Sequence, residues 1–415
     1  MKKHKIDMEK EQEDFINWDF KKANTKEYTH CIHTYPAMMI PQIARRLIYL
    51  YGKEAKTLLD PFCGSGTSLV EASLNQNLKE AYGFDLNPLA ILISKVKTTS
   101  IDELALLSAL KIILSKRDEK VTLPNFKNID FWFKPKVIKD LAMIKKSINK
   151  LENKDIKDFF KVCFSEAVRN TSNTRNGEFK LYRMPKEKLE DYNPNVFKEF
   201  EKIVSKYIKG ITEYNKSKTN TKIKIDLFSS MNNLPIEDNS IDIIVTSPPY
   251  GDSKTTVAYG QFSRLALQWL DYENINSLDN KLLGGKASED LEVNINSDTL
   301  KKIINKISKI DKKRAREVLS FYEDFDKVVI QLNRVMAKNG YICFVVGNRT
   351  VKGLNIPTDK IMSEMFMACG NYKYITTHER AIPNKRMPKV NSPTNIKGQK
   401  VTTMCNEFIF VLQKV

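Results

Sequence analysis

The chain has 415 residues, and its 68 Lys and Arg against 50 Asp and Glu give a formal net charge of +18. Its mixed composition, 41 % hydrophobic, excludes a collagen-like, low-complexity or wholly disordered protein, and its length suggests two to three domains. No apolar run approaches the roughly 18 residues of a membrane span, and the charged N-terminus lacks the apolar stretch of a secretory signal. The basic excess favours a polyanionic partner such as nucleic acid, although lysine-rich codon usage would give the same composition.

Cysteine and histidine usage indicates the compartment. The six cysteines are scattered without a CxxC pair, and with only four histidines the sequence shows no zinc-binding spacing. We therefore expect a reduced, cytoplasmic protein without structural disulfides, without a metal site and without a membrane partner.

The first predicted unit is β-α-β. Residues 57–60 and 81–85 are short apolar runs that each end at an Asp, and residues 67–73 between them have helical periodicity. A helix is also predicted upstream, over 41–51.

A basic helical segment follows. From Ile101 to Lys222 the chain carries 27 Lys and Arg against 17 Asp and Glu, so this segment holds +10 of the net charge. Apolar residues recur there at three- and four-residue spacing, which predicts helices.

The strand-like pattern then resumes at residues 222–226, 241–246, 341–347 and 406–413, with an amphipathic helix over 321–336. This order predicts a doubly wound, Rossmann-like α/β sheet interrupted by a helical insertion. We expect an N-terminal extension (1–28), a catalytic domain (29–100 and 222–415, with a polar insertion at about 253–316) and a helical insertion (101–221).

The first motif is DPFCGSGT, residues 60–67. A strand ends at Asp60, a turn with Gly64 and Gly66 follows, and a helix begins near Thr67. Glycine allows positive φ and the close approach of a ligand, so the turn is suited to a cofactor at the helix N-terminus. The spacing differs from GxGxxG, which disfavours a dinucleotide.

The second motif is GFDLNP, residues 83–88. Asp85 ends the next strand, 25 residues after Asp60, where a carboxylate accepts hydrogen bonds from both ribose hydroxyls. A helix N-cap by Asp85 or Asn87 is an alternative that is compatible with this role.

The third motif, TSPPY, directly follows a predicted strand. Pro248 and Pro249 stiffen the loop, so that Ser247 Oγ and the Pro248 carbonyl present acceptors at fixed positions to an exocyclic amine. Tyr250 offers a ring on which a base can stack. A proline loop with a packed tyrosine is the structural alternative.

Together, DPFCGSGT and TSPPY resemble the amino-group S-adenosylmethionine-dependent DNA methyltransferases, most closely the cytosine-N4 type, over residues 29–94 and 222–415. The resemblance implies S-adenosyl-L-methionine as the cofactor. It implies a cofactor site made of Tyr35, Pro36, Asp60, Phe62, Gly64, Gly66, Thr67, Asp85 and Asp226. In that site Asp85 would hold the ribose and Asp226 would lie near the adenine.

The resemblance also implies methyl transfer to the N4 amine of cytosine in a specific duplex DNA sequence. Ser247, Pro248, Pro249 and Tyr250 would be the catalytic residues, and the target base would be flipped out of the helix. The chain would be the modification enzyme of a restriction–modification system with a separately encoded endonuclease. Carbon-5 methylation is disfavoured because the sequence has no Pro-Cys dipeptide to supply its nucleophile.

Basic residues in three segments are candidates for nucleic-acid contacts, because Arg and Lys bind phosphates and base edges. They are Arg169, Arg175, Lys180 and Arg183 in the insertion, Lys254 after TSPPY, and Lys385 with Arg386. Solvated loops are the alternative for each. The insertion is also the candidate target-recognition region.

Three other functions remain open. Adenine-N6 methylation is one, because serine before the two prolines is a preference of the cytosine-N4 type. An RNA guanine-N2 methyltransferase is another, disfavoured because only 59 residues precede Asp60. An inactive nucleic-acid-binding module is the third, disfavoured by the two complete motifs.

Overall fold

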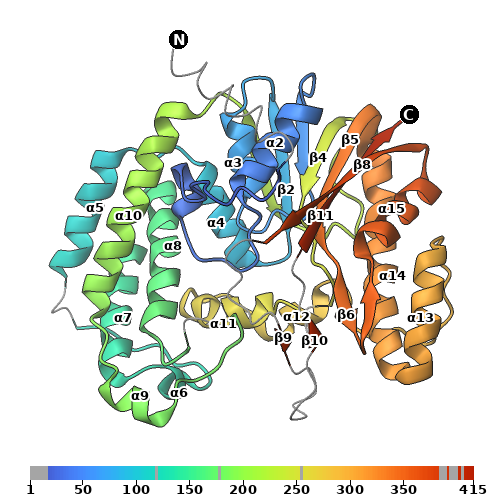
Figure 1. Ribbon diagram of the computed structural model, residues 1–415. Helices are drawn as coiled ribbons and strands as arrows, with labels where there is room; N and C mark the ends of the chain where they lie inside the picture. The colour runs from blue at the N-terminus through green and yellow to red at the C-terminus, as the bar shows by residue number, and fades with distance from the viewer. Residues whose placement is uncertain are drawn as a thin grey trace.

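The computed structural model describes residues 17–116, 120–175, 179–252, 256–382, 390–391, 401–402 and 406–415. Its centre is a seven-stranded sheet in the order β3-β2-β1-β4-β5-β11-β8 (Figure 1). The strands are β1 (Thr57–Asp60), β2 (Glu80–Asp85), β3 (Lys222–Leu227), β4 (Ile241–Thr246), β5 (Met336–Gly347), β8 (Tyr372–Ala381) and β11 (Asn406–Lys414).

Strand direction identifies the architecture. β1 to β5 are parallel, whereas β11 lies antiparallel between β5 and β8. The predicted doubly wound, Rossmann-like sheet is therefore confirmed, with the carboxyl ends of β1, β2, β3 and β4 at one edge. Ligands bind at that edge in such folds.

Helices cover both faces of the sheet. α2 (Pro41–Tyr51), α3 (Thr67–Leu74) and α4 (Pro88–Thr98) pack on one face; α13 (Asp298–Ile310), α14 (Lys312–Val335) and α15 (Thr358–Cys369) pack on the other. The strands alternate accordingly, since Leu58 and Ile243 belong to the first core and Leu59 and Ile244 to the second.

In the described residues between α4 and β3 there are six helices, and we call residues 103–217 the helical lobe. They are α5 (Glu103–Ser115), α6 (Ile129–Trp132), α7 (Pro135–Asn149), α8 (Lys154–Thr171), α9 (Lys186–Asp191) and α10 (Val196–Ser217). In Figure 1 the lobe stands beside the sheet, on the side away from α13 to α15.

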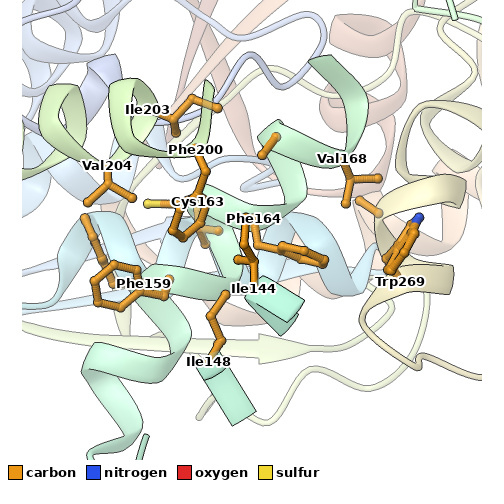
Figure 2. Close-up of a cluster of buried hydrophobic side chains, with 14 of the residues drawn as sticks. Ile144, Ile148, Phe159, Cys163, Phe164, Val168, Phe200, Ile203, Val204 and Trp269 are labelled. Atoms are coloured by element: carbon orange, nitrogen blue, oxygen red, sulfur yellow. The ribbon is translucent and has the colours of Figure 1, made fainter. Parts of the chain in front are cut away.

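The lobe shares its core with the rest of the protein. Figure 2 shows Phe164, Phe159 and Phe200 of the lobe in one cluster with Trp269, which belongs to α11 (Tyr259–Trp269) of the segment after TSPPY. The same cluster includes residues of α4 such as Leu89 and Ile93. The lobe is therefore not an appendage on a flexible linker.

Shorter elements complete the chain. They are η1 (Tyr28–Cys31), η2 (Ile275–Ser277), α12 (Leu278–Lys281), β6 (Arg349–Val351), β7 (Leu354–Ile356), β9 (Val390–Asn391) and β10 (Val401–Thr402). None of the helices in the described part of the chain has the length and apolar character needed to cross a bilayer.

Candidate active site

The turn after β1 is shaped by two glycines. Gly64 has φ +49° and Gly66 has φ +81°, a region that other residues rarely adopt. A Cβ on Gly66 would lie 2.7 Å from Ser94 Cβ of α4, so this position also requires glycine for packing. The turn closes through a 2.7 Å hydrogen bond from Gly66 N to Cys63 O, and α3 begins at Thr67 as predicted.

Asp85 ties this turn to the end of β2. Its Oδ2 accepts a 3.0 Å hydrogen bond from Gly64 N, and its Oδ1 accepts a 2.8 Å bond from Asn87 N. Burial raises the pKa of Asp85 to about 6, because desolvation disfavours the carboxylate. Asn87, the alternative candidate, is the N-cap of α4, and its side chain accepts from Leu89 N.

Asp60 ties β1 to the strand that carries TSPPY. Thr246 Oγ1 donates a 2.6 Å hydrogen bond to Asp60 Oδ1, and Phe62 N donates to the same oxygen at 3.2 Å. The side chain is buried, which raises the pKa of Asp60 to about 6. Thr246 immediately precedes Ser247, so Asp60 joins the DPFCGSGT turn to the TSPPY motif.

One cavity lies at the carboxyl edge of the sheet, between these motifs. Among its lining residues are the predicted Tyr35, Pro36, Asp60, Phe62, Gly64, Thr67, Asp85, Ser247 and Pro249. Gly66 is not among them, because it packs against Ser94. Pro248 is buried next to the cavity wall.

The charge of the cavity suits a cationic ligand. Asp60 and Asp85 are acids, and none of the described lining residues is Lys, Arg or His. S-adenosyl-L-methionine carries a sulfonium and an ammonium against one carboxylate, so its net charge is positive. The residues present therefore fit this cofactor.

Asp226 lies away from this cavity. It is exposed on β3, opposite Phe84 in the register, and it does not line the cavity. The residues that follow β3 line the cavity instead, namely Phe228, Ser229, Ser230 and Met231. Ser230 Oγ anchors this loop through a 2.6 Å bond to Pro61 O. The role predicted for Asp226 thus receives no support from its position.

Two tyrosines and an asparagine form part of the cavity wall; of these, only Tyr35 was predicted as a cofactor-site residue. Asn87 Nδ2 donates to Tyr35 OH at 3.0 Å and to Ser263 Oγ of α11 at 2.7 Å. The Tyr35 ring stacks on Tyr259 with centroids 5.9 Å apart. Asn87 was visible in the sequence only as a capping candidate, and Tyr259 carried no motif signal.

The TSPPY loop presents Ser247 to the cavity. Ser247 and Pro249 line it, while Tyr250 lies behind them, packed against the core of the α14 face. Tyr250 OH is 3.2 Å from Ser247 Oγ and donates a 3.0 Å hydrogen bond to Glu407 Oε1 at the start of β11. Burial, followed by the nearby Glu407 charge, raises the pKa of Tyr250 well above its usual value.

The predicted nucleic-acid contacts are dispersed. Arg169 is buried, with its guanidinium 4.2 Å from the centre of the Phe262 ring, which does not favour a phosphate contact. Arg175 and Arg183 are exposed and Lys180 is half-buried. Lys254, Lys385 and Arg386 lie outside the described residues.

Arg175, Lys180 and Arg183 belong to one structure, which we call the lobe tip (residues 174–175 and 179–183, with Phe131). Its two arms pair as an isolated β-bridge between Thr174 and Arg183. Phe131, Phe179 and Tyr182 expose 44–46 % of their surface here, and Arg183 lies 4.3 Å from the centre of the Phe131 ring.

The lobe tip contacts the helix that follows TSPPY. The Phe179 ring lies 6.4 Å from that of Phe262, and Leu181 N donates to Gln261 Oε1 at 3.5 Å. Phe262 and Gln261 belong to α11, whose first residue, Tyr259, lines the cavity. The basic and aromatic tip therefore contacts the helix whose first residue lines the cavity.

Comparison with known proteins identifies the family. Over 425 aligned residues, the chain is 48 % identical to the Type II methyltransferase M.MvaI of Kocuria varians, covering 95 % of this chain and 93 % of that protein. The chain belongs to the Type II methyltransferases. This Type II methyltransferase is also 32 % identical over 109 residues to the Type II methyltransferase M.MjaII of Methanocaldococcus jannaschii, covering 25 % of this chain and 20 % of that protein.

Other comparisons cover the fold and the cofactor region. Residues 27–109 match the model of the RMKL-like methyltransferase domain family. An S-adenosylmethionine-dependent methyltransferase of Methanosarcina mazei aligns with 10 % identity and a TM-score of 0.32, covering 89 % of this chain and 97 % of that chain. An rRNA methyltransferase of Streptomyces viridochromogenes aligns with 9 % identity and a TM-score of 0.32, covering 92 % of this chain and 88 % of that chain.

Family membership confirms several predictions. The protein is an S-adenosylmethionine-dependent DNA methyltransferase of the restriction–modification type. The predicted cofactor is confirmed, and the RNA and inactive alternatives are not favoured.

Proposed function

We propose that this methyltransferase transfers a methyl group to the exocyclic N4 amine of cytosine in a specific duplex DNA sequence. The observation that carries the proposal is the placement of Ser247 and Pro249 of the TSPPY motif in the wall of the acidic cavity. When bound there, S-adenosyl-L-methionine supplies an electrophilic methyl group. Serine before the two prolines favours cytosine N4 over adenine N6.

The chemistry that the protein must supply is positioning. The amine nitrogen is a poor nucleophile, because its lone pair is delocalised into the base. Hydrogen bonds from its N–H groups to Ser247 Oγ and the Pro248 carbonyl would favour a pyramidal nitrogen whose lone pair faces the methyl group. Holding the two reactants in this geometry accelerates the reaction without a covalent protein intermediate.

The base must leave the duplex to reach the cavity, so we propose that it is flipped out and stacked on the part of the half-buried Tyr250 ring that stays accessible. Arg175, Lys180 and Arg183 of the lobe tip would contact the phosphates, and the exposed Phe179 and Tyr182 rings would stack on bases. These contacts give the helical lobe, within the predicted insertion 101–221, its role in target recognition. A separately encoded endonuclease would cleave the unmodified sequence.

The decisive experiment is nucleoside mass spectrometry of DNA incubated with the protein and labelled cofactor. We expect label in N4-methylcytosine. Label in N6-methyladenine would assign the adenine alternative. No label in DNA, together with label in a parallel incubation with tRNA, would overturn the DNA substrate.

A further inference from the structure

A hydrogen-bonded chain of side chains runs from the cavity wall to a buried arginine. Tyr250 OH lies 3.2 Å from Ser247 Oγ and 3.0 Å from Glu407 Oε1. The other carboxylate oxygen, Glu407 Oε2, accepts a hydrogen bond from Arg380 Nη1 of β8. Arg380 is 4 % exposed and is held in turn by the Trp18 carbonyl, which accepts from its Nε at 3.0 Å. The chain therefore ends at a fixed positive charge.

The ends of this chain determine the direction of every hydrogen bond in it. An ionised carboxylate only accepts, so Tyr250 must donate its proton to Glu407. The Tyr250 oxygen then accepts from Ser247, whose single proton is committed to that bond. Ser247 Oγ is left with lone pairs alone on the side of the cavity.

We propose that Glu407, acting through Tyr250, fixes Ser247 as a hydrogen-bond acceptor for the substrate amine and receives the proton that the amine loses. This inference rests on the proposed function, because it requires an amino group as the methyl acceptor. Glu407 is a positioning residue and proton acceptor that does not touch the base.

The step balances in atoms and charge. The amine nitrogen forms a bond to the methyl carbon as the sulfonium–methyl bond breaks, leaving a neutral thioether. The cationic nitrogen then keeps the electron pair of one N–H bond, and its proton passes to Ser247 Oγ. The Ser247 proton moves to the Tyr250 oxygen, and the Tyr250 proton moves to the Glu407 carboxylate. Release of that proton to water regenerates the ionised acid.

The surroundings of Glu407 support this role. Its register partner on β5 is Gly347, which has no side chain, and its partner on β8 is Arg380. Two further acids lie nearby in the described structure: Asp19 accepts from Ala381 N, and Glu379 accepts from Asn406 Nδ2. Neither acid is hydrogen-bonded to Tyr250, so among the acids of the described residues Glu407 alone joins the chain.

The substitution Glu407→Gln tests the direction of the chain. Arg380 needs an acceptor, so the Gln oxygen faces Arg380 and the Gln NH₂ group faces Tyr250. Tyr250 then donates to Ser247, and the Ser247 proton points at the substrate N–H. The Ser247 hydroxyl and the substrate amine then both present hydrogen-bond donors, and no carboxylate receives the proton that the amine loses. We therefore expect the single-turnover rate at saturating DNA and cofactor to fall about 100-fold. Cofactor and DNA dissociation constants should change less than about threefold.

The double variant separates this chain from a merely structural role. Tyr250→Phe keeps the ring for stacking but frees the Ser247 proton to rotate, so it should slow transfer less than Glu407→Gln does. In the Glu407→Gln, Tyr250→Phe double variant there is no Tyr250 hydroxyl left to donate to Ser247. The transfer rate should therefore recover to that of Tyr250→Phe alone. If the rate of the double variant instead falls by the product of the two single-variant losses, the two residues act independently and the proposal is overturned.

A matched control and a product assay complete the test. Glu379→Gln makes the same charge change on β8, outside the chain, and should keep the wild-type rate. A wild-type transfer rate for Glu407→Gln would refute the role proposed for Glu407, while the proposed methylation of an amine would stand. Wild-type transfer to a site other than a DNA amine would refute the proposed function itself.

Discussion

At the end of β2, one carboxylate organises two loops around the cofactor cavity. Asp85 accepts from Gly64 N with one oxygen and from Asn87 N with the other. Hydrogen bonds to an ionised group are stronger than those between neutral groups, so the carboxylate fixes both loops while leaving lone pairs for a ligand. The position of Asp85 in the sequence predicted its place in the cavity wall, but not these two bonds.

Replacing Asp85 by Asn should weaken cofactor binding. Asparagine offers one acceptor oxygen, so either Gly64 N or Asn87 N meets an NH₂ group, and the negative charge facing the cationic cofactor is lost. We expect the cofactor dissociation constant, measured by calorimetry, to rise about 10- to 100-fold, equivalent to about 1.5–3 kcal/mol for a hydrogen bond to a charged group. Asp226→Asn is the matched control. Asp226 lies at the end of the neighbouring strand, outside the cavity. An equal loss of cofactor affinity in this variant would restore the predicted role of Asp226 near the adenine.

Cofactor binding should also depend on pH through Asp60 and Asp85. Burial raises the pKa of each from 3.8 to about 6 in the protein without ligand. These acids therefore stabilise the fold fully below pH 3.8, and this contribution is lost as the pH rises through about 6. A cationic ligand favours the ionised forms, so its affinity should rise over the same window. The cofactor should then raise the melting temperature more at pH 7.5 than at about pH 5. An equal rise in melting temperature at the two pH values would contradict a role for these two carboxylates in cofactor binding.

At the scale of elements, the lobe tip illustrates what residue type alone does not reveal. Arg169 and Arg175 belong to the same polar run in the sequence, yet Arg169 lies in α8 facing the interior and Arg175 lies beyond the helix end, exposed. The end of α8 at Thr171 decides this difference, because Arg169 still lies on the face of α8 that packs against Phe262 of α11, whereas Arg175 follows the helix.

Removing charge at the lobe tip should weaken DNA binding and its salt dependence. In the triple variant with Arg175, Lys180 and Arg183 changed to Gln, each lost phosphate contact should flatten the log K against log salt slope by about one unit. Fluorescence anisotropy with a duplex at several salt concentrations measures this slope. The control removes three charges from exposed lysines of the lobe outside the tip, namely Lys111, Lys209 and Lys216. Equal slopes for both variants would place DNA recognition elsewhere.

Elements with little apolar contrast escaped prediction. α14 begins at Lys312, nine residues before the predicted start, because Asp311 caps it by accepting from Arg314 N. Its first turn lies inside the stretch assigned to a polar insertion. β8 was not predicted, because it is an edge strand with a mostly half-buried or exposed sequence.

At the scale of the whole molecule, one continuous core joins the lobe to α4 and α11. Trp269 is fully buried, and its ring meets Phe133, Phe126 and Phe164 edge-on at 5.6–5.9 Å. Since Trp269 ends α11, the helix after TSPPY is fastened into the lobe. A movement of the lobe would therefore act on α11, whose first residue, Tyr259, lines the cavity.

Phe164→Ala tests this continuity. Removing a fully buried ring should lower the free energy of unfolding by about 3–5 kcal/mol. Because the core is shared, we expect calorimetry to show one transition shifted as a unit. Ile112→Ala, at a site that is 55 % exposed on α5, is the control and should change stability by less than about 0.5 kcal/mol. Two separated transitions would mean that the lobe folds on its own.

The sequence by itself determined the fold class, and it located the DPFCGSGT turn and the TSPPY loop, which line one cavity in the structure. Each depends on local signals: apolar periodicity, glycines that allow a positive φ, and prolines that stiffen a loop next to the residues they position. Tertiary structure alone decided which side chains meet across the sheet. β3 continues to Leu227, one residue past the predicted end at Asp226, and Phe228 after it lines the cavity in place of Asp226. Glu407 contacts Tyr250 although 157 positions separate the two residues. The sequence located much of the +18 charge in the segment 101–222, but only the fold shows that Arg175 and Arg183 are exposed at the lobe tip while Arg169 lies in the core.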